Sequence, residues 1–103
     1  MDETAADLAG LQRLLDESAS RAGPHLRSIF APALRLSAAE ACERLTGIRI
    51  WTVATSSAAG RPLAAPLDGV LHRGRLHVAT APTAVRARQL AVRPAASATY
   101  LEG

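Results

Sequence analysis

Residues 48–80 carry the clearest structural pattern in the chain, and their sequence is IRIWTVATSSAAGRPLAAPLDGVLHRGRLHVAT. Its beginning alternates between two sets of side chains, as a strand does between its two faces. One face is expected to carry Ile48, Ile50, Thr52 and Ala54, and the other Arg49, Trp51, Val53 and Thr55. The small residues at 56–60 then predict a turn that ends at Gly60.

Two further strands are predicted after that turn. Residues 63–72 form an extended run that contains Pro66 and Gly69, and a proline inside a strand indicates an edge, a bulge or a kink facing a ligand. Arg73-Gly74 is typical of a tight hairpin turn, so residues 75–80 are expected to return as a third strand. The pattern therefore predicts an antiparallel sheet.

A short helix and one more strand are predicted towards the C-terminus. Residues 85–92 contain good helix formers, with Thr83 as the expected N-cap and Pro94 beyond the helix end. Residues 95–101 follow as the last strand. One helix is thus expected between the third and fourth strands.

Residues 1–45 are expected to be helical. Two capping boxes mark helix starts: Thr4 with Asp7, and Ser37 with Glu40. Gly23-Pro24 is predicted to end the first helix, because proline does not continue a helix and glycine suits the position after its end.

The resulting fold class is α+β with a mainly β core. The chain has 103 residues, which suits a single small domain, and its hydrophobic content of 49% argues against disorder. Within that domain we expect a helical extension over residues 1–45 and a strand-rich part over residues 46–103.

Three features concern the compartment. No apolar stretch approaches the roughly 20 residues that a membrane-spanning helix needs. The acidic start, Asp2-Glu3, is unlike the basic start of a signal peptide. Cys42 is the single cysteine and cannot form an internal disulfide. We therefore expect a cytoplasmic protein with no membrane partner.

The charge is unevenly distributed, and every basic residue is an arginine. Residues 1–45 carry five arginines and seven acidic residues, whereas residues 46–103 carry seven arginines and two acidic residues. Any anion-binding site must therefore use arginine, which offers a planar, bidentate donor. The C-terminal part is the one expected to attract an anionic partner.

The junction between the third strand and the following helix is the most suggestive site. It contains Thr80 and Thr83, and a helix N-terminus offers free N–H groups that suit a phosphate. Arg86 lies in the first turn, where a cation is unfavourable unless an anion offsets it, and Arg88 lies just beyond. The alternative, in which Arg86, Arg88 and Arg93 form an ordinary solvated face, stays open.

Other chemistries find no matching pattern. No Gly-x-Ser-x-Gly elbow surrounds Ser56 or Ser57, and the three histidines lack the spacing of a zinc site. The glycines show neither dinucleotide-binding nor P-loop spacing. Trp51 and Tyr100 lie apart in sequence from the arginine cluster, so no stacking platform for nucleic acid is expected. Neither a metal site nor a nucleic-acid partner is predicted.

Several short segments together resemble the pyridoxamine 5′-phosphate oxidase-like family of flavin-binding split barrels. They occur in the family's order and cover much of the chain from residue 46 to residue 103. The matching segments are residues 51–55, 60–62, 63–68, 74–80, 85–90 and 93–97. The helical start is similar to an extension found in some actinobacterial members.

This resemblance implies a homodimeric split β-barrel that binds FMN, or the deazaflavin of many actinobacterial relatives, at the subunit interface. Thr80 and Arg86 match the family's phosphate-binding positions, and Arg88 lies next to them. The strand that lies along the flavin ring in the family matches Ala65, Pro66, Leu67 and Asp68. The activity implied is hydride transfer to or from a small organic substrate, with no catalytic residue identified.

The chain also departs from the family. Val70, Val85 and Ala65 stand where true pyridoxamine phosphate oxidases carry basic residues, which argues against the vitamin B6 reaction. Only about four strands are predicted, whereas the family's barrel needs about six, so residues 46–103 are expected to be an incomplete split-barrel domain. We favour a fragment of a longer protein, the alternative being an edge covered by dimerisation. The alternatives are a non-catalytic module that binds flavin or haem, and a module that binds nucleic acid or protein.

Overall fold

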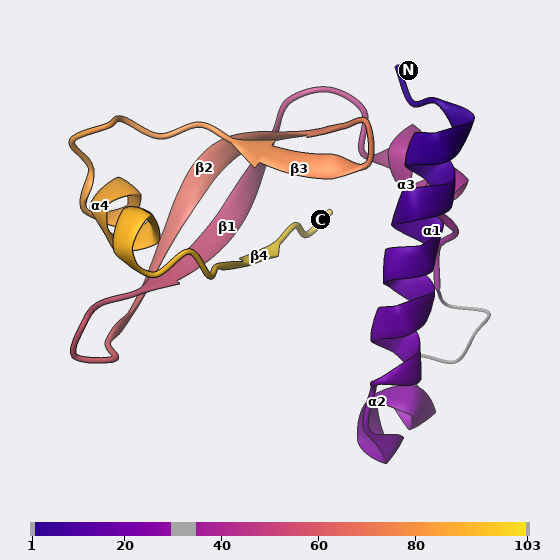
Figure 1. The fold of residues 1–103 in the computed structure, drawn as a ribbon, viewed down its shortest axis with the longest axis horizontal. Helices are drawn as coiled ribbons and strands as arrows, with labels where there is room; N and C mark the ends of the chain where they lie inside the picture. The colour runs from indigo at the N-terminus through magenta and orange to yellow at the C-terminus, as the bar shows by residue number, and fades with distance from the viewer. Residues whose placement is uncertain (1, 30–34, 103) are drawn as a thin grey trace. The chain divides into compact units, whose positions relative to one another are not determined.

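The structure is a computed structural model that describes residues 2–29 and 35–102 (Figure 1). These residues form helices and strands in the order α1 (Ala5–Ser20), α2 (Pro24–Ile29), α3 (Ala38–Arg44), β1 (Arg49–Ser56), β2 (Pro62–His72), β3 (Arg75–Val78), α4 (Val85–Val92) and β4 (Ser97–Thr99).

The four strands form one curled antiparallel sheet, half of a barrel, in the order β3-β2-β1-β4. The central strand β1 pairs with β2 on one side and with β4 on the other, so that Thr52 is opposite both Pro66 and Thr99. Helix α4 lies in sequence between β3 and β4. The predicted α+β class, with a split-barrel-like sheet and a helical N-terminal part, is confirmed.

The two faces of the sheet differ in burial, as the alternation in β1 predicts. On one face Val53, Thr55 and Leu67 are only 4–6% exposed, and Trp51 is half-buried. On the other face Ile50 is 64% exposed. The face that carries Trp51, Val53 and Thr55 is therefore the inner one, and the face that carries Ile50 is the outer one.

The hairpin between β2 and β3 turns at Arg73 and Gly74, as predicted. Both residues have positive φ, +52° and +80°, as a type I′ turn requires. Pro66 lies inside an unbroken β2. Strand β3 ends at Val78, and Ala79 N–H then donates to Asp68 O at 2.9 Å. Among the strands described, Pro66 is therefore beyond the reach of β3, at an edge position that tolerates its missing N–H.

Both predicted capping boxes are present. The Thr4 side chain accepts from the Asp7 N–H while Asp7 accepts from the Thr4 N–H, and Ser37 and Glu40 do the same at the start of α3. Gly23-Pro24 follows a helix that has already ended at Ser20, and Pro24 is the first residue of α2. A proline at the first position of a helix loses no hydrogen bond.

Three boundaries in the C-terminal part differ from the sequence prediction. The N-cap of α4 is Ala84 instead of Thr83, and it makes no side-chain capping bond. Strand β3 stops at Val78, short of Thr80. Strand β4 covers only Ser97–Thr99, because its pairing with β1 is limited to three residues.

Residue contacts divide the chain into two compact units. One consists of Met1–Gly47 with the hairpin segment Leu71–Leu76, and the other of Ile48–Val70 with His77–Gly103. In the first unit Ala38 and Cys42 are each 2% exposed, and Ala38 N–H donates to Gln12 Oε1 at 2.8 Å, which joins α3 to α1. Burial, together with the nearby Glu3 carboxylate, raises the pKa of the Cys42 thiol. None of the helices described here is both long and apolar enough to cross a bilayer.

Candidate functional site

The start of α4 offers hydrogen-bond donors that the chain itself does not use. The first N–H groups of any α-helix have no acceptor within the helix. No side chain caps them here, because the N-cap is Ala84, and no acidic residue lies in the first turn. The Ala84 and Ala87 N–H groups donate to Ala81 O and Ala84 O, at 3.0 and 3.1 Å. The N–H groups of Val85 and Arg86 and the positive partial charge of the helix end therefore remain for a ligand.

Two side chains next to this helix start carry buried polar atoms that lack a hydrogen-bond partner. They are the Thr80 hydroxyl, Oγ1, and the Arg86 guanidinium nitrogen, Nε. Both side chains are half-buried. Leaving a buried polar atom unpaired costs about 1–3 kcal/mol, and more for a charged group. We call Thr80, Arg86 and the first turn of α4 the anion site.

A phosphate fits this donor set. A hydroxyl and a guanidinium both donate hydrogen bonds, and phosphate oxygens accept several at once. Arg86 in the first turn opposes the helix dipole, so an anion bound there would be attracted both by the helix end and by the guanidinium. The residues present therefore suit the phosphate group of a nucleotide-like cofactor.

The three arginines in and after α4 do not share one solvated face. Arg93 Nε donates to Ser56 O at 2.9 Å, which ties the end of α4 to β1. Arg88 is exposed. Arg86 is half-buried with an unpartnered Nε. Of the three, Arg86 is the one that has a buried donor without a partner.

The four residues predicted to lie along a flavin ring are divided between the two faces of the sheet. Ala65 and Leu67 are on the inner face, where they pair with Val53 and Trp51. Pro66 and Asp68 are on the outer face and are exposed. A planar ligand on one face of β2 would therefore meet two of these side chains, while the backbone of β2 remains common to both faces.

Thr80 comes directly after Ala79, the last residue of the segment that is hydrogen-bonded to β2. The last bond between these segments is from Ala79 N–H to Asp68 O, at 2.9 Å. Thr80 is thus the residue after the one bonded to Asp68, in the segment that leads from β3 to α4. The structure brings the predicted phosphate-binding threonine and the predicted ring-contacting strand to neighbouring positions.

A polar contact that the sequence pattern does not report joins α4 to the sheet. Thr55 Oγ1 donates to Gln89 Oε1 at 2.6 Å, and Thr55 is only 5% exposed. The signal in the sequence was a threonine on the same strand face as Val53. Its partner could not be identified because that partner depends on which helix covers the face.

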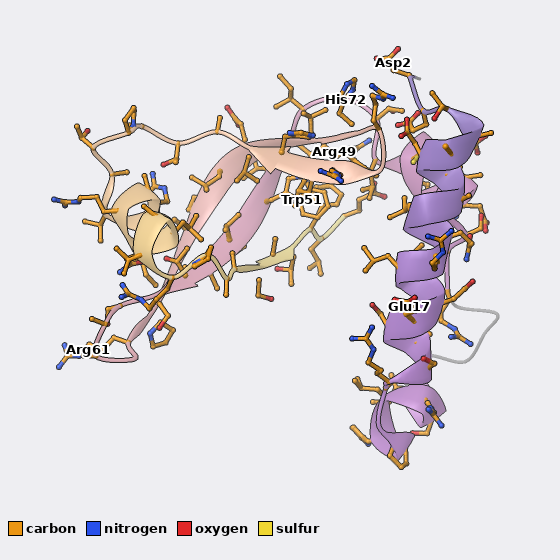
Figure 2. All side chains as sticks on the ribbon, in the orientation of Figure 1. Asp2, Glu17, Arg49, Trp51, Arg61 and His72 are labelled. Atoms are coloured by element: carbon orange, nitrogen blue, oxygen red, sulfur yellow. The ribbon has the colours of Figure 1, made fainter. Side chains whose placement is uncertain are left out.

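The two aromatic residues of the strand-rich part lie together with an arginine. The rings of Trp51 and Tyr100 are 5.4 Å apart, centroid to centroid, and Arg49 Nη1 donates to the Tyr100 hydroxyl at 2.7 Å. Arg49 also lies over the Tyr100 ring, 5.3 Å from its centroid. Figure 2 labels Arg49 and Trp51, which come from β1. The two rings therefore contact each other, and Tyr100 contacts Arg49, which is not one of the arginines of the cluster at residues 86–93.

The residue types considered for other chemistries are engaged elsewhere. Ser57 Oγ accepts from the Arg61 N–H at 3.0 Å within the turn between β1 and β2, and Ser56 Oγ donates to Ser57 O. His72 Nδ1 lies 3.8 Å from Asp2 Oδ2. Within residues 2–29 and 35–102, no three His, Cys, Asp or Glu side chains are grouped as metal ligands would be.

No protein-family model matches this chain, and neither a curated protein nor a solved structure shows significant similarity to it.

Proposed function

We propose that this chain binds a flavin-type cofactor, FMN or the related deazaflavin, through its phosphate at the anion site. We further propose that it acts as a homodimeric cytoplasmic oxidoreductase on a small organic substrate. The observation that supports this most directly is the pair of buried, unpartnered donors, Thr80 Oγ1 and Arg86 Nε, beside an uncapped helix start. The half-barrel sheet and the resemblance of residues 46–103 to flavin-binding split barrels point to the same ligand class.

Each group has a role in this proposal. Thr80 and Arg86 donate hydrogen bonds to phosphate oxygens, and exposed Arg88 adds long-range attraction. In this proposal the ring extends from the phosphate along the backbone of β2 at Ala65–Asp68, where Leu67 is part of the dry inner face. The bound cofactor would supply hydride transfer, while the chain supplies orientation and exclusion of water.

The direct test is to purify the protein, record its absorbance, and identify any released chromophore by mass. A flavin or deazaflavin spectrum, or saturable binding of added FMN, is the expected result. A haem spectrum would favour the alternative binding module. A colourless protein with no affinity for FMN, deazaflavin or haem would overturn the proposal. Turnover with a chemical or nicotinamide reductant then separates an enzyme from a storage or sensing module.

Replacing Arg86 tests the anion site itself. We expect Arg86→Ala to weaken FMN binding by about 1.5–3 kcal/mol, the usual value of a hydrogen bond to a charged group. Arg88→Ala should cause a smaller loss, because Arg88 is exposed and its attraction is screened by salt. Isothermal titration calorimetry measures the FMN affinity of the wild type and of both variants.

The matched control is Arg75→Ala. Arg75 is an exposed residue of β3, so its replacement removes the same charge from the chain without touching the anion site. Equal losses in Arg86→Ala and Arg75→Ala would mean that only net charge matters, and the assignment of the site would be wrong.

A further inference from the structure

Helix α4 has little to hold it in place by itself. It contains eight residues, fewer than the roughly 12–15 at which an isolated helix becomes stable in water. It lacks a side-chain cap, has no acidic residue in its first turn and no basic residue in its last, and none of its residues is fully buried. Its position must therefore come from contacts with the rest of its unit.

Two polar contacts connect α4 to the end of β1. Gln89 Oε1 accepts from Thr55 Oγ1 at 2.6 Å, and Arg93 Nε donates to Ser56 O at 2.9 Å. The donor Thr55 and the acceptor Ser56 are consecutive residues of the strand that occupies the centre of the sheet. At these two residues β1 is paired with Leu63 and Pro62 of β2, so the support for the helix is part of the sheet.

The Thr55–Gln89 bond is directional in a way that apolar packing is not. Thr55 is 5% exposed, so its hydroxyl depends on Gln89 for a partner. Residues three apart on a helix lie one above the other on the same side. Arg86 is three residues before Gln89, one turn nearer the helix start. A bond that sets the rotation of α4 at Gln89 therefore also sets the direction in which Arg86 projects.

We propose that Thr55 and Gln89 are positioning residues for the anion site: their part-buried hydrogen bond fixes the orientation of α4 in which the site can receive a phosphate. This inference rests on the proposed function. Thr55 and Gln89 do not contact the phosphate. They act through α4 on Arg86 and on the N–H groups of the first turn.

The ratio of FMN affinity to riboflavin affinity tests this proposal, because the two ligands differ only by the phosphate. If the chain prefers the deazaflavin, the coenzyme and its phosphate-free chromophore form the equivalent pair. A loss of structure lowers both affinities together and leaves the ratio unchanged. A displaced anion site lowers the ratio.

We expect Thr55→Val, which keeps the shape but removes the hydroxyl, to lower the ratio roughly tenfold, corresponding to about 1.4 kcal/mol. Thr55→Ser, which keeps the hydroxyl, should restore most of it. Because Thr55 is buried, Thr55→Val can also impair folding, so Gln89→Met serves as a second single variant at a half-buried helix position. It should lower the ratio to a similar extent. The double variant should be no worse than either single variant if the two residues act as one pair.

The possible results distinguish a failure of the positioning role from a failure of the proposed function. A wild-type chain with no preference for FMN over riboflavin would overturn the anion site, and the positioning role with it. A clear preference that survives in both Thr55→Val and Gln89→Met would overturn the positioning role alone. A preference lost in Thr55→Ser as well as in Thr55→Val would show that the hydroxyl is not the group that matters.

Discussion

Gly69 lies in β2 where the strand faces the indole of Trp51. A Cβ atom at this position would be 2.6 Å from Trp51 Cδ1 and 3.2 Å from Val78 Cγ1. The indole has little room to move, since it is already packed against Tyr100. We expect Gly69→Ala to lower the free energy of unfolding by about 1–3 kcal/mol, as overpacking does. Urea unfolding followed by the fluorescence of the single tryptophan measures this.

Gly10 provides the opposite case with the same chemical change. It lies in the middle of α1, is exposed, and has no atom within 4 Å of an added Cβ. Gly10→Ala should raise the stability of the helix by about 0.5–1 kcal/mol, because alanine loses less backbone entropy on folding. Circular dichroism during thermal unfolding reports the change. A Gly69→Ala protein as stable as the Gly10→Ala protein would contradict the close approach of Trp51.

At the residue scale the sequence predicted those contacts that depend on neighbours along the chain. Thr80 and Arg86 could be singled out because a strand, a turn and a helix start follow each other there, and their unpartnered atoms are consistent with that hypothesis. Thr55 and Gln89 could not, because they are 34 residues apart and meet only once α4 covers β1. No periodicity within a single element reports such a pair.

At the element scale, both capping boxes make helix stability depend on pH. The Thr4 backbone N–H, followed by the Arg73 guanidinium, holds the pKa of Asp7 below its ordinary value. The backbone and side chain of Ser37 do the same for Glu40. A carboxyl group with a lower pKa in the folded state stabilises that state above its unfolded pKa of about 4, and this contribution is lost as pH falls through the folded value.

We therefore expect α1 and α3 to lose stability progressively as the pH falls below about 5, through the unfolded pKa values and then through the lower folded ones. Thermal unfolding followed by circular dichroism at 222 nm over this range measures the loss. Asp7→Asn should be less stable at pH 7 and should show a weaker pH dependence. Asp16→Asn removes the same charge from α1 outside both boxes, and its pH profile should follow that of the wild type. If Asp7→Asn left the pH dependence of stability unaltered, the capping-box carboxylate would not be its cause.

The same elements show why some boundaries could be predicted and others could not. Thr4 with Asp7 and Ser37 with Glu40 are complete signals within four residues, and both helices begin where the sequence indicates. The start of α4 is different. Ala84 is its N-cap although Thr83 has the better side chain, because the chain leaves β3 early and is tied to β1 through Gln89 and Arg93. Tertiary contacts override the local preference there.

At the scale of the whole molecule, the grouping of segments depends on contacts that span much of the sequence. The hairpin segment Leu71–Leu76 belongs to the same compact unit as the N-terminal helices. Arg73 Nε donates to Asp7 Oδ2 at 3.0 Å across 66 residues, and a Cβ at Gly74 would lie 3.2 Å from Asp7 O. Local sequence patterns predict the turn at Arg73 and Gly74, but they do not predict that this turn packs against Asp7.

The outer face of the sheet exposes apolar residues to water. An antiparallel sheet usually presents polar residues on a face turned to water. Here Ile50 is 64% exposed, and exposed Pro66 lies diagonal to it on the same face, next to the polar residues Asp68 and Thr52. Exposed apolar groups that lie together mark an interaction site. A second copy of the chain is the partner we propose, because the proposed function is that of a homodimer.

We expect the purified protein to be a dimer by sedimentation equilibrium, and Ile50→Lys to shift it to a monomer while its circular dichroism spectrum stays unchanged. A lysine on this face places two charges in a symmetric interface, one from each subunit, where they are desolvated without partners. Leu14→Lys is the control, because Leu14 is also exposed, at 56%, but lies on α1. It should leave the dimer intact. A monomeric wild-type protein would contradict self-association. A dimer unaffected by Ile50→Lys would place the interface on another surface.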